Sequence, residues 1–495
     1  MRRVSMANAR ECRRAMRHAP DYGTWAEAAQ QLDVLTGREA WKADDESPLY
    51  DFRMIRARKR QLKRLRERGD AAGLMHELRQ GLHWNMGGIG SPSLYAQTFI
   101  GTKQLVSGYI DEVCCALTEL ASPASPIDAQ ERLRFFEETA LSFGRTGLML
   151  SGGATLGLFH IGVIKTLWEH QALPRVISGS SAGSVVAATL GTHTDDEVEA
   201  IFDADMARFG FWRGLSPGSI LKRRALMDQA QVRRGIQHFV ADMTFEESYR
   251  RTGRVVNVTV SPANTAQSPK LVNHVTFPHL CMREAVLASC AVPLIFEPVL
   301  LYQRDHRGAK VPFLPNVKWV DGSMKSDLPR LRLRRLHNVN HFIVSQTNPH
   351  VVPFLALRGS RSRGGRSGIL RSYALEALKE QSKLLAGLGR DLLPPGVLRN
   401  RLDTVHGLLE QSYRGNITIG PNFRLNQFRQ MISNPSLQAT RDMILAGERA
   451  TWPKLSMILH QTRISQTLDT ALRQVQGGTQ QAGDSRIQRM QLKTG

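Results

Sequence analysis

This 495-residue sequence contains few cysteines, no long apolar run and no internal repeat. Its five cysteines are Cys12, Cys114, Cys115, Cys281 and Cys290. They form no CxxC pair and no Cys/His spacing, which argues against a zinc site or a disulfide framework and favours a reducing compartment. Because no run of about 18 apolar residues is present, no transmembrane helix is expected. Residues 1–7 lack the apolar segment of a secretory signal, so none is expected there.

The chain is strongly basic, with 66 basic and 44 acidic side chains and a net charge of +22. Three interpretations are open: a solvated surface, attraction to anionic lipid headgroups, or nucleic-acid binding. No RNP or comparable motif is present, so no nucleic-acid partner is expected. Residues 52–66 predict a basic amphipathic helix, either a surface helix or one that docks on a membrane, whose apolar stripe is interrupted by Arg58.

The pattern changes at about residue 140, where short apolar runs typical of β-strands begin to alternate with helical patterns. Strands are predicted at 148–150, 176–177, 255–260, 317–320 and 341–345. Strands separated by helices indicate an α/β fold with a mostly parallel sheet.

Two pentapeptides have the form Gly-x-Ser-x-Gly, and the first spans residues 179–183. It follows the apolar run 176–177 and precedes small residues of helical character, which is the pattern of a nucleophile elbow around Ser181. Such a turn exposes the serine hydroxyl, and the helix N-terminus favours the developing negative charge. Gly179 and Gly183 are needed because a Cβ at either position would crowd the turn.

The second pentapeptide, residues 214–218, serves as an internal control. No apolar strand leads into it. Its Pro217 has no N–H to offer an oxyanion after the serine. We therefore interpret Ser216 as a loop or helix-cap residue.

Two further segments complement Ser181. The glycine turn at Gly152 and Gly153, which continues through Ala154 to Gly157, lies between a predicted strand and a helix. Its backbone N–H groups could stabilise the oxyanion of acyl transfer, although a phosphate-binding loop would look similar. Asp321 and Gly322 follow an apolar strand, where ligand sites of α/β proteins form.

The order and type of these pieces resemble the patatin-like phospholipase family, whose members use a Ser–Asp dyad without a catalytic histidine. The resemblance implies that Ser181 is the nucleophile and Asp321 the proton acceptor. It also implies that Gly152, Gly153 and Ala154 form the oxyanion hole, without metal or cofactor. Thr155 and Leu156 stand where many members carry an Arg or Lys before the last glycine of this loop. The resemblance therefore gives less support for selectivity toward phospholipid headgroups.

The segments 49–87, 109–113, 338–346 and 447–453 narrow the resemblance to the fungal and plant triacylglycerol lipases of lipid droplets, over about residues 48–470. This implies a lipid acyl hydrolase acting on triacylglycerol or phospholipid. It also implies a cytoplasmic protein that associates peripherally with membranes or droplets.

The expected fold is a patatin-like three-layer core with helical regions before and after it. The expected boundaries are a poorly defined segment at 1–45, a helical domain at 46–139, the catalytic domain at 140–346, a mainly helical region at 347–470 with a basic loop at 358–368, and a disordered tail at 471–495.

Several alternatives are open. A Ser-His-Asp triad could use His337, His341 or His350, which follow Asp321 in the chain. Asp327 is the nearest competing acid, but its surroundings indicate a turn. The acyl site could be vestigial in a protein that only binds lipid surfaces. An acyltransferase would share the first half-reaction, so the sequence does not separate it from a hydrolase. His160 either contacts the site or simply packs.

Overall fold

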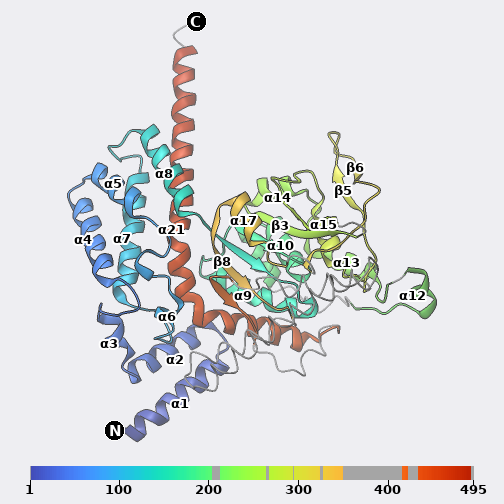
Figure 1. The fold of residues 1–495 in the computed structure, drawn as a ribbon, viewed down its shortest axis with the longest axis horizontal. Coiled ribbons are helices and arrows are strands. Elements are labelled where there is room, and N and C mark those ends of the chain that lie inside the picture. The colour runs from blue at the N-terminus through green and yellow to red at the C-terminus, as the bar shows by residue number, and fades with distance from the viewer. Residues whose placement is uncertain are drawn as a thin grey trace, which may run out of the picture. The chain divides into compact units, whose positions relative to one another are not determined.

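The computed structural model describes residues 2–202, 212–223, 225–263, 267–293, 295–323, 327–348, 415–421 and 433–491. The predicted basic loop at 358–368 lies outside these ranges. The chain divides into two compact units (Figure 1). The first comprises Met1–Thr146, Asn338–His341 and Trp452–Gly495, and the second comprises Gly147–His337 and Phe342–Thr451.

The first unit is helical. Its elements are α1 (Arg2–His18), α2 (Tyr22–Leu35), α3 (Arg38–Ala43), α4 (Phe52–Glu67), α5 (Ala71–Gly81), η1 (Met86–Gly88), α6 (Pro92–Tyr95), α7 (Gln104–Ala121) and α8 (Ala129–Phe143). The basic helix predicted at 52–66 is α4, capped by Asp51. Its apolar residues Ile55 and Leu62 are buried in the core of this unit and α4 packs on α7, as expected for a surface helix. Arg58 reaches Glu77 in α5 with an N–O distance of 3.1 Å.

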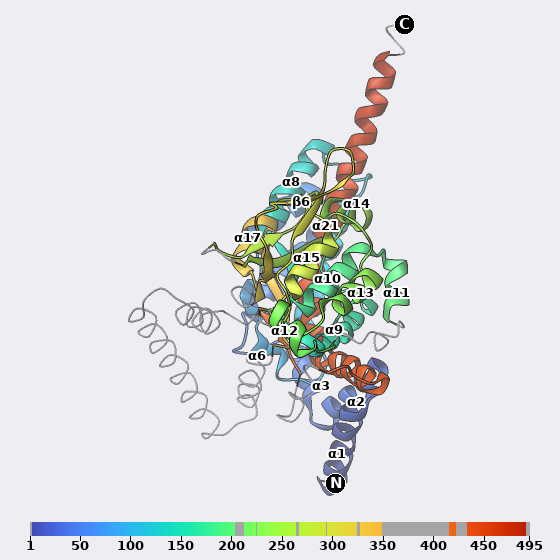
Figure 2. The ribbon, with the colours of Figure 1, turned by 90° about the vertical axis from the view of Figure 1, so that its right-hand side faces the viewer.

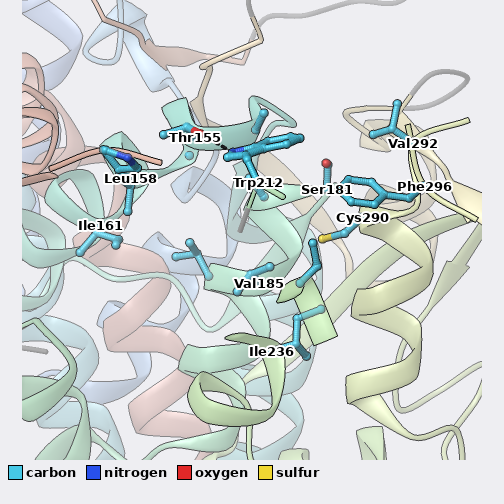
Figure 3. Close-up of a pocket in the computed structure, with 16 residues that line it drawn as sticks. Thr155, Leu158, Ile161, Ser181, Val185, Trp212, Ile236, Cys290, Val292 and Phe296 are labelled. Carbon is cyan, nitrogen blue, oxygen red and sulfur yellow. Dashed lines mark hydrogen bonds between the residues drawn. The ribbon is translucent and has the colours of Figure 1, made fainter. Parts of the chain in front are cut away.

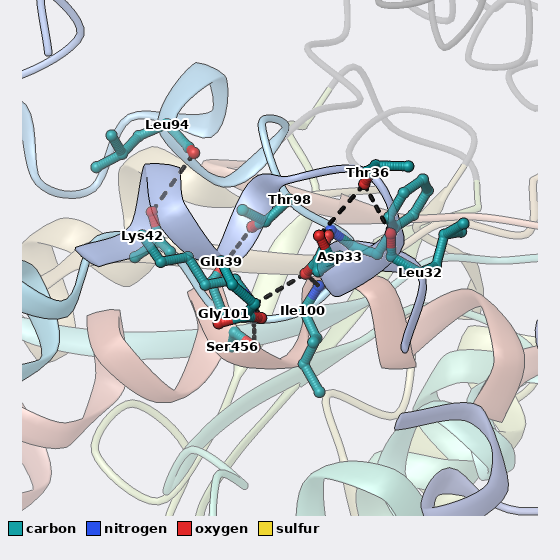
Figure 4. Close-up of polar contacts among 12 residues, drawn as sticks. Leu32, Asp33, Thr36, Glu39, Lys42, Leu94, Thr98, Ile100, Gly101 and Ser456 are labelled. Atoms are coloured by element: carbon teal, nitrogen blue, oxygen red, sulfur yellow. Dashed lines mark hydrogen bonds and ion pairs between the residues drawn. The ribbon is translucent and has the colours of Figure 1, made fainter. Parts of the chain in front are cut away.

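Residues 2–43 differ from the expected poorly defined segment, since they form α1, α2 and α3. The reason lies in α2, where Trp25, Ala29 and Leu32 follow a helical spacing and are buried. Polar contacts also hold this region. Asp33 accepts the backbone N–H groups of Phe99 and Ile100 and pairs with Lys42 at 2.9 Å (Figure 4). A buried ion pair with this many donors fixes the geometry of the segments it joins.

The long helix α21 (Leu437–Gln491) has residues in both units. It continues through the region expected as a disordered tail from 471. Leu468, Ala471 and Val475 are buried in the core of the first unit, at spacings of three and four residues. This helical periodicity was hidden by the Gln- and Gly-rich composition that follows it.

The second unit contains the sheet, apart from the first residues of two strands. The strands are β1 (Arg145–Leu150), β2 (Val176–Gly179), β3 (Val255–Pro262), β4 (Lys270–Val272), β5 (Leu301–Arg304), β6 (Lys310–Phe313), β7 (Trp319–Asp321), β8 (Val339–Ser345) and β9 (Ile417–Ile419). Among the described residues, seven of them form one sheet in the order β4-β3-β2-β1-β8-β9, with β7 paired to β3 off that path. The pairs β1–β2, β2–β3 and β8–β9 are parallel. A mostly parallel sheet was predicted and is found.

The second unit also contains helices in its described part. They are α9 (Leu158–Glu169), α10 (Ala182–Thr192), α11 (Asp195–Phe202), α12 (Pro217–Arg223), α13 (Gln229–Phe239), α14 (Phe245–Thr252), α15 (Met282–Cys290) and α17 (Arg330–His337), with η2 (Ala154–Gly157) before α9. All eight residues of β3 are buried, and alternate side chains point to opposite faces, so both faces of the sheet are covered. The helices α10 and α15 pack on β3 (Figures 1 and 2).

The sheet receives two strands that the sequence did not predict, β4 and β9. The residues of β9 pair in parallel with Ile343–Ser345 of β8, although they lie in the region expected to be mainly helical. A three-residue strand is too short to produce a recognisable periodicity.

Candidate active site

Ser181 lies in the turn between β2 and α10. Its φ of 50° and ψ of −124° are rare for a residue with a side chain. Strain of this kind costs on the order of 1–3 kcal/mol and persists only where neighbouring groups enforce it. One such group is Ser289 of α15, whose hydroxyl accepts the Ser181 backbone N–H at 2.9 Å and donates to the Thr259 carbonyl at 2.9 Å.

The glycines on both sides of Ser181 are required by close packing. A Cβ on Gly179 would lie 2.2 Å from the Gly183 carbonyl oxygen. A Cβ on Gly183 would lie 2.4 Å from the Leu150 carbonyl oxygen. Both obstacles are backbone atoms, which cannot move aside as a flexible side chain can. The turn therefore tolerates only glycine at these positions.

Asp321 is the last residue of β7, which runs antiparallel to β3 with Asp321 opposite Val260. The sequence did not reveal this direction. The pairing still brings Asp321 to the carboxyl end of the parallel strands, where β2 continues into the turn that holds Ser181. Gly322 makes this possible because a Cβ there would lie 2.7 Å from the Thr259 carbonyl carbon.

The Asp321 carboxyl group is buried, with 2% of the residue exposed. Its Oδ1 accepts the Ser323 backbone N–H at 2.7 Å. Burial raises the pKa of Asp321 to about 6, and hydrogen bonding from Ser323 and from the Ser181 hydroxyl opposes the rise. Among the described residues, Oδ2 accepts no hydrogen bond of normal geometry. A buried carboxylate oxygen without a partner, beside a serine hydroxyl, can accept a proton from it.

The loop before α9 differs in part from the expected oxyanion hole. The Gly152 N–H donates to Asp327 Oδ1 at 2.9 Å, so this amide is already engaged. The amides of Gly153 and Ala154 donate to no other residue in the described part of the chain. Ala154 has a φ of 52°. A Cβ on Gly157 would lie 2.5 Å from the Cβ of Ala182, so the loop and the N-terminus of α10 are in close contact.

A cavity of about 130 Å³ opens beside Ser181. Its lining is apolar except for the hydroxyls of Thr155 and Ser181 and the thiol of Cys290, and no described lining residue is charged. Figure 3 shows the Ser181 hydroxyl between the rings of Trp212 and Phe296. The Trp212 indole N–H donates to Thr155 Oγ1 at 2.7 Å, which ties this wall to the glycine loop. An apolar chain can therefore lie next to the serine.

The histidines of the alternative triad have other partners. His337 is hydrogen-bonded to Asn257 Oδ1 at 2.9 Å, and His341 lies 3.2 Å from Thr146 Oγ1. Burial lowers the pKa of His341 to about 4, so it is neutral at physiological pH. The third candidate, His350, lies outside the described residues.

Three residues of this site were missed or undervalued in the sequence. Ser289 and Trp212 lie far from the motifs in the chain, and only the folded structure brings them to Ser181. Asp327 follows Asp321 by six residues and was considered only as a competing base, because its surroundings indicated a turn. Its hydrogen bond to the glycine loop depends on tertiary structure alone.

Comparison with known proteins gives matches along most of the chain. Residues 148–333 match the family model described as patatin-like phospholipase, and residues 2–141 match a domain of unknown function, DUF3336. The chain is 35% identical over 488 residues to triacylglycerol lipase 4 of Saccharomyces cerevisiae, covering 93% of this chain and 52% of that protein. It is 34% identical to triacylglycerol lipase ptl2 of Schizosaccharomyces pombe, covering 94% and 76%.

The lipase ptl3 of the same yeast is 32% identical, with 90% of this chain and 93% of that protein covered. Other curated relatives are longer, since the chain spans between 52% and 64% of the length of three of them. Within the described ranges, no helix is long and apolar enough to cross a membrane.

Proposed function

This chain belongs to the patatin-like phospholipase family, and from that premise we propose that it hydrolyses acyl esters of glycerolipids with Ser181 as nucleophile and Asp321 as general base. The observation that carries the proposal is the pairing of these two side chains. Among the described residues, Oδ2 of the buried Asp321 has no hydrogen-bond partner. Burial raises the pKa of Asp321, and hydrogen bonding from the Ser181 hydroxyl opposes this rise. Ser181 itself lies in a strained turn at the edge of an apolar cavity.

The reaction proceeds by two acyl transfers. Asp321 takes the Ser181 proton as Oγ attacks the ester carbonyl carbon, and the carbonyl oxygen becomes an oxyanion. The amides of Gly153 and Ala154 donate to this oxyanion, with the Gly152 amide held by Asp327 instead. Collapse of the tetrahedral intermediate breaks the bond to the alcohol, which receives the proton from Asp321. Water then loses a proton to Asp321 and attacks the acyl-enzyme carbonyl carbon. The bond to Ser181 Oγ breaks, the fatty acid leaves, and Asp321 returns the proton to the serine oxygen.

The substrate we propose is a neutral glycerolipid, with triacylglycerol first. Two observations support this choice. The described lining of the cavity contains no charged residue that would pair with a phosphate, whereas it accommodates an acyl chain. The relatives reported above are named triacylglycerol lipases. The net charge of +22 further supports peripheral association with an anionic lipid surface, of a membrane or of a droplet.

The test is a side-by-side assay of the purified protein on emulsified triacylglycerol, phospholipid and lysophospholipid, with Ser181→Ala as the control. We expect fatty-acid release that is fastest from triacylglycerol and absent in the variant. Release from none of the lipids would refute the proposed activity. Faster release from phospholipid would refute the substrate preference and leave the activity intact.

A further inference from the structure

The glycine loop is held by a buried polar network that the proposed reaction does not use. The network surrounds Gly152 and holds the peptide group on each side of it. Asp327 is 1% exposed and accepts the Gly152 N–H through Oδ1 at 2.9 Å. On the other side, the Gly152 carbonyl accepts hydrogen bonds from Ser151 Oγ at 2.8 Å and from Thr347 Oγ1 at 3.1 Å. Gly152 is thus restrained through both its N–H and its C=O.

His160 supports the same side of the loop. Its Nε2 lies 3.0 Å from the Ser151 carbonyl oxygen, and its Nδ1 lies 2.7 Å from Ser345 Oγ. A carbonyl oxygen can only accept, so Nε2 carries the proton and Nδ1 accepts from the serine hydroxyl. Burial lowers the pKa of His160 to about 4, so it remains in this neutral form. His160 therefore orients the backbone of the loop and does not transfer protons.

The direction of the Gly153 N–H follows from the planarity of the peptide bond between Gly152 and Gly153. In a trans peptide, the C=O of one residue and the N–H of the next point in opposite directions. Because two hydroxyls hold the Gly152 carbonyl on the buried side, the Gly153 N–H points away from them. Thr347 also packs closely on this peptide, since a Cβ on Gly153 would lie 2.2 Å from Thr347 Oγ1. The direction of the Gly153 N–H is thus set by groups that never touch substrate.

Asp327 additionally joins this loop to the turn that holds the nucleophile. Its backbone carbonyl accepts the hydroxyl of Ser180, the residue before Ser181, at 2.9 Å. Its Oδ2 accepts the Asn348 side-chain amide at 3.1 Å. One residue therefore contacts the glycine loop, the turn before Ser181 and the segment after β8. A shift of Asp327 would move the Gly153 N–H relative to the Ser181 hydroxyl.

We propose that Asp327 is a positioning residue for acyl transfer. Together with Thr347 it restrains Gly152, Asp327 through the N–H and Thr347 through the C=O, and so directs the Gly153 N–H toward the oxyanion. The inference rests on the proposed function of Ser181 and Asp321. It predicts that changes at Asp327 weaken stabilisation of the transition state and leave binding of the ground-state ester unchanged.

The first test compares Asp327→Asn with the double variant Asp327→Asn/Asn348→Asp, using a soluble chromogenic ester. In the single variant, the new amide group can still accept the Gly152 N–H, but its NH2 then faces the NH2 of Asn348. We expect kcat per titrated active site to fall about 10- to 100-fold with KM nearly unchanged, and affinity for a trifluoromethyl ketone, which forms a tetrahedral adduct, to fall in parallel. In the double variant the NH2 faces a carboxylate, so most of the kcat should return.

A purely structural role would lower the amount of folded enzyme and leave kcat per active site unchanged. Unchanged kcat in folded Asp327→Asn would overturn the inference, and so would a double variant that recovers nothing. If Asp327→Asn does not fold, the kcat values of Thr347→Val and Thr347→Ser test the inference instead. Only the serine retains a hydroxyl for the Gly152 carbonyl, so the valine variant should lose kcat and the serine variant should keep it. Equal kcat in both would overturn the inference.

Loss of the proposed function would give a different pattern. If Ser181→Ala retains turnover, the assignment of the nucleophile fails. If Ser181→Ala abolishes turnover while the Asp327 and Thr347 variants remain fully active, only the positioning role fails.

Discussion

Two segments of the second unit share the pattern Gly-x-Ser-x-Gly and differ in nearly everything else. In residues 179–183, Ser181 has a φ of 50°, is 9% exposed and follows a buried strand. In residues 214–218, Ser216 is exposed, precedes α12 and donates its hydroxyl to Ser219 at 2.9 Å. A Cβ on Gly183 would meet backbone at 2.4 Å, whereas a Cβ on Gly214 or Gly218 would meet nothing within 4 Å.

The Gly-x-Ser-x-Gly pentapeptide is therefore not sufficient to make its serine reactive. Reactivity requires that tertiary packing hold the serine in a rare conformation, next to a base and to amide donors. Ser181 has all three and Ser216 has none among the described residues. The glycines of the first segment are fixed by packing, and those of the second serve a surface turn. The predictions below test whether this difference in surroundings accounts for the difference in function.

The largest expected effect is the loss of activity in Ser181→Ala, with Ser216→Ala as the matched control. Removing the nucleophile of a serine hydrolase typically lowers kcat by about 10⁶-fold, so no turnover should be measurable. The control should retain the full rate because, in the part of the chain that the structure describes, the exposed Ser216 hydroxyl is hydrogen-bonded to Ser219 and not to the site. Initial rates on a chromogenic ester measure both. Comparable losses in the two variants would refute the distinction between the segments.

The next effect concerns the glycines. In Gly183→Ala the added methyl group would overlap the Leu150 carbonyl oxygen, and overpacking of this kind costs about 1–3 kcal/mol or more. In Gly218→Ala the methyl group enters open space, so the free energy of unfolding should change by less than about 0.5 kcal/mol. Urea unfolding measures both values. A Gly183→Ala protein as stable and active as its counterpart would contradict the packing argument.

The buried base gives Ser181 a pH dependence. The reaction needs ionised Asp321, whose pKa is raised to about 6 by burial, so kcat/KM should rise with pH and level off above this value. At pH 5 the rate should be about tenfold below the plateau. Asp327, whose pKa is raised to about 7, faces the same loop and broadens the transition. A rate that stays constant from pH 5 to 8 would show that Asp321 is not the base.

The raised pKa of Asp321 also makes the free energy of unfolding depend on pH. The folded-state pKa of Asp321 lies above its unfolded value of 3.8, so its ionisation favours the unfolded chain as pH rises from about 4 to 6. Asp321→Asn should therefore be more stable than the wild type at pH 7, and this advantage should disappear near pH 4. Thermal unfolding at the two pH values tests this sign.

The smallest expected effect concerns Ser289 and Ser219, which are hydrogen-bonded to Ser181 and Ser216, respectively. Ser289→Ala removes the acceptor for the strained Ser181 N–H, and we expect about a tenfold loss in kcat, since removing one partner of a buried hydrogen bond costs about 1–3 kcal/mol. Ser219→Ala removes the partner of Ser216 and should leave kcat unchanged. Rates normalised to titrated active sites measure both. Equal effects would mean that Ser289 does not support the turn.

The sequence was sufficient for the main features of the fold, and the structure places Ser181 and Asp321, which we proposed as a pair from the sequence, at the same end of the sheet. The apolar runs at 148–150, 176–177 and 255–260 correspond to β1, β2 and β3, because parallel strands that are buried on both faces are apolar along most of their length. The strand at 317–320 was also expected, but its antiparallel pairing with β3 was not, since direction depends on a long connection that has no local signature.

The rest of the site could not be predicted because it consists of contacts between distant segments. The Gly152 amide was expected to face the oxyanion, and only the folded chain shows that Asp327 occupies it. Trp212 and Ser289 lie in no recognisable sequence motif, so nothing in the sequence indicates that they belong to the site. Likewise, the apolar stripe of α4 could have faced either a membrane or a core, and burial of Ile55 decides between them. Such choices depend on which surfaces meet, which a single sequence does not specify.

The most direct test of the central claim is to label the protein with a fluorophosphonate and locate the modified residue by peptide mass spectrometry. The probe reacts only with a serine whose hydroxyl is activated, so the account predicts stoichiometric labelling of Ser181 and none of Ser216. Labelling should disappear in Ser181→Ala and remain in Ser216→Ala. Modification of Ser216, or no modification of Ser181 in the folded wild-type protein, would contradict the account.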